Sequence, residues 1–110
     1  MMIIKRDDTE AKDLGEGVTR RILNRGGSLM IVEFCFKKGA IGALHSHPHE
    51  QIGCITSGSG VFTIDGKETE IKTGDSMYMP PNAIHGFVSH EDNTVIIDIF
   101  TPQREDFLDA

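Results

Sequence analysis

Apolar residues recur along the chain in many short runs, and glycine- or proline-rich turns separate these runs. Residues 28–37, SLMIVEFCFK, are almost continuously apolar, and the runs at 61–64 and 69–72 flank an Asp65-Gly66 pair. An aspartate-glycine pair between β-rich segments is a strong signal for a hairpin. The pattern therefore predicts an all-β sandwich or barrel.

The remaining segments extend this prediction over one domain, residues 1–110. We expect an edge strand at 1–5, a loop over 7–17, and further strands at 19–24, 51–56, 76–79, 84–89 and 94–101. Only the tail after Pro102, QREDFLDA, is predicted to be helical, and it is short. A chain of 110 residues is long enough to bury roughly two thirds of its unfolded surface in a single core.

Charge and cysteine content exclude several classes of protein. The net charge is -6, from 17 acids against 11 bases, which disfavours binding to nucleic acid or to an anionic membrane. An acidic ligand would need local attraction from a metal or a placed arginine. Cys35 and Cys54 lie in apolar runs without CxxC spacing, which favours reduced, buried thiols. The start, MMIIKRDD, has too few apolar residues for a signal peptide or a membrane span, so we expect a cytoplasmic protein.

Residues 39–58, GAIGALHSHPHEQIGCITSG, carry the clearest candidate chemistry. His45 and His47 are two apart, so an extended strand would direct both rings to one face, where they could hold a metal ion. Gln51 shares this parity and Glu50 does not. A bulge after Pro48 would exchange the two, which leaves open which of them is a fourth ligand.

The spacing of these residues resembles the cupin superfamily. The first cupin motif is matched by Gly39, His45, His47, Gln51 and Gly58, and the second by Gly74, Pro80, Asn82 and His85. Asn82 replaces a motif glycine, which is tolerable because asparagine also adopts left-handed backbone conformations. The resemblance implies a double-stranded β-helix, or jelly-roll barrel, to which the tail pattern adds a short C-terminal helix. It also implies a homodimer.

Gln51 stands where most cupins carry glutamate. A glutamine oxygen can bind a metal but brings no charge, which favours Lewis-acid chemistry over oxygen chemistry. The resemblance implies one divalent transition metal ion, and histidine and glutamine would suit Zn, Ni, Mn, Fe or Cu.

The last predicted strand contains an acid among isoleucines. Alternation puts Asp98 on one face with Ile96 and Phe100. Burying a carboxylate is costly unless it is paired or functional. Asp98 is therefore either satisfied by a structural hydrogen bond or by Arg104, or it serves a reaction.

Three segments resemble a narrower group, the cupins of pectin and alginate breakdown that linearise unsaturated uronates. They are HSHPHEQ at 45–51, PPNAIHG at 80–86 and DIFTPQREDFL at 98–108. This resemblance implies metal ligands at His45, His47, Gln51 and His85, and substrate-handling residues at Asp98, Phe100 and Arg104. It implies an anionic sugar as substrate. The alternatives are a quercetinase-like dioxygenase and a non-catalytic module that binds a sugar or another small molecule.

Overall fold

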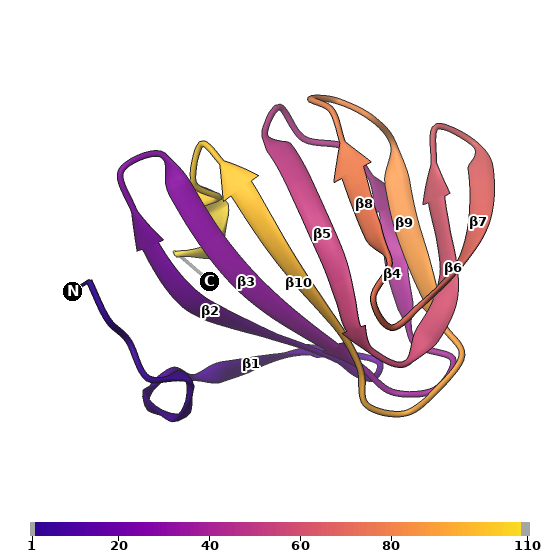
Figure 1. The fold of residues 1–110 in the computed structure, drawn as a ribbon, viewed down its shortest axis with the longest axis horizontal. Helices are drawn as coiled ribbons and strands as arrows, with labels where there is room; N and C mark the ends of the chain where they lie inside the picture. The colour runs from indigo at the N-terminus through magenta and orange to yellow at the C-terminus, as the bar shows by residue number, and fades with distance from the viewer. Residues whose placement is uncertain (1, 109–110) are drawn as a thin grey trace.

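The computed structural model describes residues 2–108 and arranges them in two antiparallel β-sheets that face each other (Figure 1). One sheet has six strands in the order β1-β2-β3-β10-β5-β8, and the other has four in the order β4-β9-β6-β7. The strands are β1 Ala11–Gly15, β2 Val18–Gly26, β3 Leu29–Phe36, β4 Ile41–His45, β5 Glu50–Ser57, β6 Ser59–Ile64, β7 Lys67–Lys72, β8 Ser76–Met79, β9 His85–Ser89 and β10 Thr94–Thr101. The predicted all-β jelly-roll fold is confirmed.

Two turns have the backbone conformation that the sequence predicted. Asp65 and Gly66 join β6 to β7 with φ of 47° and 84°, as a tight two-residue hairpin turn requires. Asn82, in the corner between β8 and β9, has a φ of 68°. Asparagine therefore does adopt the left-handed conformation at the position where the cupin motif has glycine.

The N-terminal prediction is wrong. Residues 2–5 form no strand, and β1 lies inside the segment that was expected to be a loop. Gly15, Glu16 and Gly17 all have positive φ, so the chain reverses there and the polar residues of β1 pair with β2 through their backbone. Hydrophobic alternation could not reveal this strand because all of its side chains are exposed.

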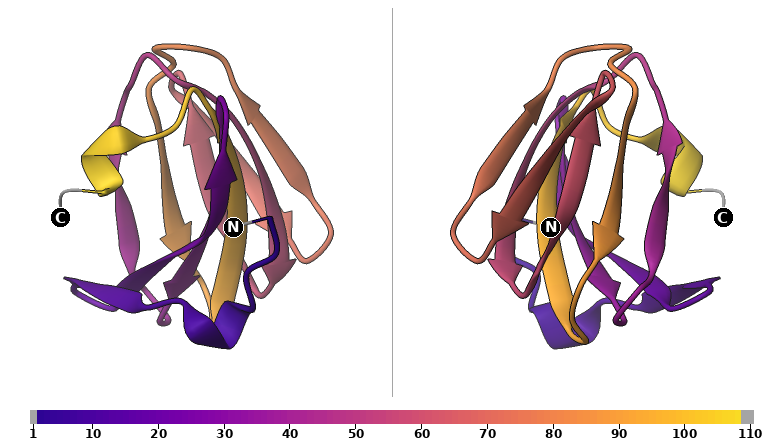
Figure 2. Two further views of the ribbon diagram at one scale, coloured as in Figure 1. Left: turned by 90° about the vertical axis from the view of Figure 1, so that its left-hand side faces the viewer. Right: turned by 90° about the vertical axis from the view of Figure 1, so that its right-hand side faces the viewer.

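The expected C-terminal helix is not confirmed. Within residues 2–108 the tail forms one short 3-10 turn, η2, Glu105–Phe107. The ring of Phe107 packs edge-on against Phe34 of β3 and Phe100 of β10, with centroids 6.2 and 5.8 Å apart. A segment this short is not a stable α-helix by itself, and these contacts instead hold the turn against the side of the barrel (Figure 2).

Apolar side chains of both sheets pack against one another between the sheets. The main cluster contains Val18, Phe36, Ala40, Ile55, Phe62, Ile71, Met77, Met79, Phe87 and Ile96. They come from both sheets because each strand directs alternate residues inward. The core thus holds together the strands that carry the histidines and Asp98.

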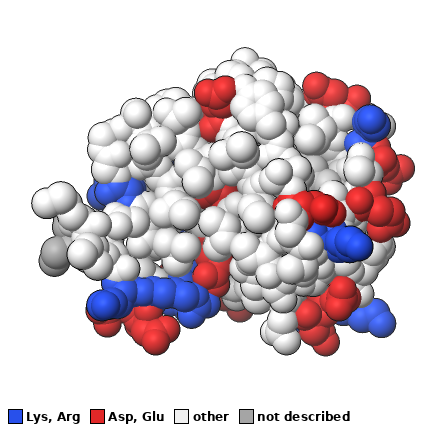
Figure 3. All heavy atoms as spheres, in the orientation of Figure 1, with Lys and Arg blue, Asp and Glu red and all other residues white. Residues whose placement is uncertain are grey.

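The outer face of the six-stranded sheet is largely uncharged, as Figure 3 shows. A row of four apolar side chains, Ile31, Ile99, Ile52 and Tyr78, lies across β3, β10, β5 and β8.

Cys35 and Cys54 are free but half-buried, so their expected full burial is not observed. No helix within residues 2–108 is long and apolar enough to cross a membrane.

Candidate active site

The end of β4 and the connection that follows it carry two of the predicted metal ligands. His45 is the last residue of β4, whereas His47 lies in the short connection before β5 begins at Glu50. A continuous strand, which the spacing suggested, therefore does not align the two rings. A backbone hydrogen bond supports the connection, because the Asn82 amide donates to the His47 carbonyl oxygen over 2.8 Å.

His85 and Gln51 join these two histidines. His85 begins β9 and is paired in register with His45. One ring nitrogen from each of His45, His47 and His85 lies within 4.8 Å of the other two. The side-chain oxygen of Gln51 lies 2.9 Å from Nε2 of His47. Three histidines are therefore positioned to bind one metal ion, and the amide group of Gln51 lies beside them.

Backbone carbonyl groups fix the orientation of all three rings. The Nδ1 atoms of His45, His47 and His85 lie 2.8, 3.2 and 3.0 Å from the carbonyl oxygens of Ala43, His49 and Ala83. A carbonyl oxygen only accepts, so Nδ1 of His45 and of His85 carries the proton and the Nε2 atom of each keeps a free lone pair, whereas both ring nitrogens of His47 face an oxygen. The Nε2 of His85 is buried and has no hydrogen-bond partner in the described chain. Ligand histidines are commonly oriented in this way, and the donor set fits a divalent transition metal ion.

The electrostatic environment keeps the buried rings neutral. Burial lowers the pKa of His47 to about 4, and the positive charge of Arg104 adds to this effect. Burial is also the main cause that lowers the pKa of His85. A neutral imidazole is the form that binds a metal, so neither ring must lose a proton to do so near pH 7.

Of the two adjacent residues Glu50 and Gln51 on β5, the structure directs Gln51 into the space between the sheets. Gln51 is 5% exposed and lines the cavity between the sheets. Glu50 is exposed and accepts a hydrogen bond from the Tyr78 hydroxyl. Gln51, rather than Glu50, is therefore directed toward the histidines, as strand parity indicated.

Asp98 occupies the inner face of β10 together with Ile96 and Phe100, as predicted, and is only 5% exposed. Its Oδ1 atom is buried and has no hydrogen-bond partner among residues 2–108. The residue opposite on β5 is Gly53, where a Cβ atom would lie 2.4 Å from Oδ1. Glycine at this position leaves room for the carboxyl group.

Burial raises the pKa of Asp98 to about 7, although the Gln51 amide and the charge of Arg104 act in the opposite direction. The described residues contain no ion pair between Asp98 and Arg104. The two structural explanations, a saturating hydrogen bond or an ion pair, are therefore not observed for Oδ1. A carboxyl group that titrates near neutral pH suits proton transfer.

This burial predicts a stability effect. The folded pKa of Asp98 lies above the unfolded value, so the folded state binds the proton more tightly, and stability declines as pH rises from about 4 through 7. Asp98→Asn should remove this loss. We expect it to raise the free energy of unfolding of the metal-free protein by up to about 4 kcal/mol at pH 8, and by much less at pH 5. Urea unfolding of both proteins at the two pH values measures this, and equal differences at both would contradict it.

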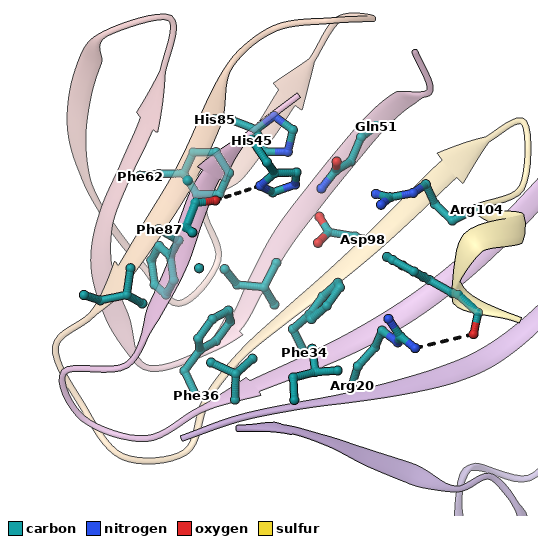
Figure 4. Close-up of a pocket in the computed structure, with 18 of the residues that line it drawn as sticks. Arg20, Phe34, Phe36, His45, Gln51, Phe62, His85, Phe87, Asp98 and Arg104 are labelled. Atoms are coloured by element: carbon teal, nitrogen blue, oxygen red, sulfur yellow. Dashed lines mark hydrogen bonds between the residues drawn. The ribbon is translucent and has the colours of Figure 1, made fainter. Parts of the chain in front are cut away.

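Arg104 lies between the last strand and the C-terminal turn. Its Nε and one terminal nitrogen donate to the two carboxylate oxygens of Asp106 over 3.0 and 2.9 Å. Its guanidinium carbon lies 4.2 Å from the centroid of the Phe107 ring. Arg104 also lines the cavity, so the structure brings it into the same space as Asp98 and the histidines (Figure 4).

Arg20 and Phe107 are among the cavity residues that the sequence did not indicate as site residues. A signal for Arg20 was present, because the alternation of β2 places it on the same face as Val18 and Ile22, where an apolar residue is expected. Phe107 gave no such signal, because it lies in a turn whose position depends on tertiary contacts.

The cavity has a volume of about 320 Å³. Aromatic and aliphatic side chains, such as Phe36, Phe62 and Ile96, line its inner part. A pocket with apolar walls and a few convergent polar groups is typical of a site for a small molecule. A jelly-roll barrel with three histidines positioned to bind a metal ion beside such a pocket is the architecture of the cupin class.

Comparison with known proteins agrees with this class. Residues 32–100 match the family model described as "Cupin domain". The chain is 43% identical over 103 residues to the pectin degradation protein KdgF of Dickeya dadantii, covering 93% of this chain and 94% of that protein. The chain therefore belongs to the cupin family.

Two solved structures share the whole fold. A RmlC-like cupin from Shewanella frigidimarina superimposes with a TM-score of 0.91 at 36% identity, covering 97% of this chain and 96% of that one. KdgF from a Halomonas species has a TM-score of 0.91 at 31% identity, covering 96% and 98%.

Proposed function

We propose that the protein is a metal-dependent enzyme that linearises 4,5-unsaturated uronate sugars to 5-keto-4-deoxyuronates in the breakdown of pectin or alginate. The observation that carries the proposal is the buried Oδ1 atom of Asp98, which has no hydrogen-bond partner within residues 2–108 and lies in the cavity that His45 and His85 also line. The similarity to two proteins called KdgF, one of them a pectin degradation protein, supports the choice of substrate.

The proposed reaction needs no second reactant. The bond between C1 and the ring oxygen breaks, the C1 hydroxyl loses its proton to leave an aldehyde, and C4 gains a proton as the enol at C5 becomes a ketone. One proton is thus moved between two sites of one molecule. A group with a pKa near the working pH transfers such a proton most efficiently, and Asp98 has this property.

Each predicted site residue has a role in this proposal. His45, His47, Gln51 and His85 would hold a divalent transition metal ion, which supplies Lewis-acid polarisation of the sugar oxygens when it is bound. Asp98 would take and return the proton. Phe100, which is 1% exposed, would form an apolar wall, and Arg104 would attract the anionic sugar. Arginine supplies the local positive charge that a chain with a net charge of -6 needs.

Two alternative functions, a dioxygenase and a non-catalytic binding module, make different predictions for the same experiment. A quercetinase-like dioxygenase would need a redox-active metal and would consume oxygen. A binding module would hold a sugar without changing it. The neutral Gln51 ligand and the near-neutral pKa of Asp98 favour proton transfer over both.

Proton NMR tests the proposal directly. Unsaturated galacturonate made by a lyase would be incubated with the metal-replete protein beside a spontaneous control. We expect the C4 vinyl signal to disappear faster than in the control, and chelation or Gln51→Ala to abolish the difference. A rate equal to the control would contradict the proposal, and oxygen uptake would then identify the dioxygenase alternative.

The homodimer and the cytoplasmic location stay predictions. Light scattering on the purified protein would measure its molar mass. The apolar row of Ile31, Ile99, Ile52 and Tyr78 on the outer face of the six-stranded sheet is the surface where we would first look for a contact with a second copy.

A further inference from the structure

Arg20 is a buried cation inside the cavity. It extends from the inner face of β2, is 8% exposed and lines the same cavity as Asp98 and Arg104. Its guanidinium carbon lies 4.1 Å from the centroid of the Phe107 ring, and one terminal nitrogen donates a long hydrogen bond of 3.4 Å to the Phe107 carbonyl oxygen (Figure 4). Most of its five N–H donors are therefore left without a protein partner among residues 2–108.

No acid within residues 2–108 forms an ion pair with Arg20. Asp106 is the acid whose charge acts on it most, but both carboxylate oxygens of Asp106 already accept hydrogen bonds from Arg104. Burying an arginine without a counter-charge is costly. The contacts with Phe107 offset only part of this cost, because they use one terminal nitrogen and one face of the guanidinium group.

The two arginines differ in what they can offer to a ligand. Both guanidinium carbons lie within 4.2 Å of the Phe107 centroid, so one aromatic ring positions both groups. Asp106 neutralises Arg104 and occupies its Nε and one terminal nitrogen. Arg20 keeps its full charge and a free pair of donors in the fork geometry that matches a carboxylate.

We propose that Arg20 binds the carboxylate group of the sugar and determines the preference for uronates over neutral sugars. This inference rests on the proposed function, since it takes the ligand to be a uronate. In this arrangement the carboxylate lies toward Arg20 and Phe107. The hydroxyl groups of the sugar then extend toward Asp98 and the histidines, across a cavity of about 320 Å³.

The experiment compares galacturonate with galactose, which differ in having a carboxylate or a hydroxymethyl group at C6. Calorimetry on the metal-replete full chain would give the affinity ratio for the wild type, for Arg20→Met and for Arg21→Met. Methionine fills a similar volume without charge. Arg21 is the matched control, because it neighbours Arg20 on β2 but bonds to Thr9 outside the cavity.

We expect the preference for galacturonate to fall about 10- to 100-fold in Arg20→Met and to stay unchanged in Arg21→Met. Arg20→Lys retains the charge without the fork, so it should reduce the preference about threefold or more. Circular dichroism establishes that each variant is folded. If Arg20→Met does not fold, the galacturonate preference of Arg20→Lys tests the proposal instead.

Two results would overturn this proposal: a wild type without preference for galacturonate, or a folded Arg20 variant that keeps the wild-type preference. A failure of the proposed function would look different. In that case the wild type would prefer galacturonate, and lose this preference with Arg20, but would not accelerate linearisation of the unsaturated sugar.

Discussion

Asp98→Asn is expected to lower kcat for linearisation about 100- to 10,000-fold while one metal ion per chain stays bound. Asparagine has nearly the same shape as aspartate, so it should fit opposite Gly53 without displacing the strand. The amide cannot take and return a proton at neutral pH. The loss should therefore appear in kcat, with a smaller change in KM.

NMR of the C4 vinyl signal gives the rate, and elemental analysis of the same sample gives the metal content. Glu68→Gln is the matched control, since it removes one exposed acid from β7, away from the cavity. A folded, metal-replete Asp98→Asn protein with kcat within about threefold of the wild type would exclude proton transfer by Asp98.

His85→Ala is expected to lower the metal content from about one ion per chain to less than about 0.1, and turnover to the spontaneous rate. The His85 ring is 3% exposed, and its Nε2 atom has no hydrogen-bond partner in the described chain. Removing the ring therefore takes one candidate ligand from the cluster. The hydrogen bond from Nδ1 to the Ala83 carbonyl oxygen is the one side-chain hydrogen bond of His85 that is lost within residues 2–108. The alanine variant should remain folded, because His85 begins β9 and the backbone pairing of that strand does not need the side chain.

His90→Ala serves as the control. His90 pairs with Glu70 at the surface and should change neither the metal content nor the rate. Chelation of the wild type should reproduce the His85→Ala rate. Full activity in a chelated protein without metal would refute the metal-dependent reaction. Proton transfer by Asp98 would then be the remaining part of the proposal.

Residues with a strong local signal were predicted well. The Asp65-Gly66 turn and the inward face of β10 follow from backbone conformation and alternation, which depend on only a few neighbouring residues. The set of histidines was indicated by motif spacing, and the structure brings the three rings together. Features of this kind depend on neighbouring residues or on a known motif spacing, so a single sequence is enough to predict them.

Features that depend on distant contacts were not predicted. The polar strand β1 exists because three successive residues with positive φ return the chain to β2, and its side chains carry no apolar pattern. His47 reaches the cluster from a connection and not from a strand. Arg20 becomes a site residue only because Phe107, 87 positions later, folds back over it.

The C-terminal turn carries Arg104 and Phe107, yet it belongs to neither β-sheet. The histidines, in contrast, come from β4, from the connection that follows it and from β9. The residues that position Arg104 and Phe107 and the residues that position the histidine cluster are therefore in separate parts of the chain. Under the proposed function, we expect substitutions within residues 102–108 to change which sugar acid fits beside Arg20 and to leave the histidine cluster intact, which makes this short tail a natural region for engineering.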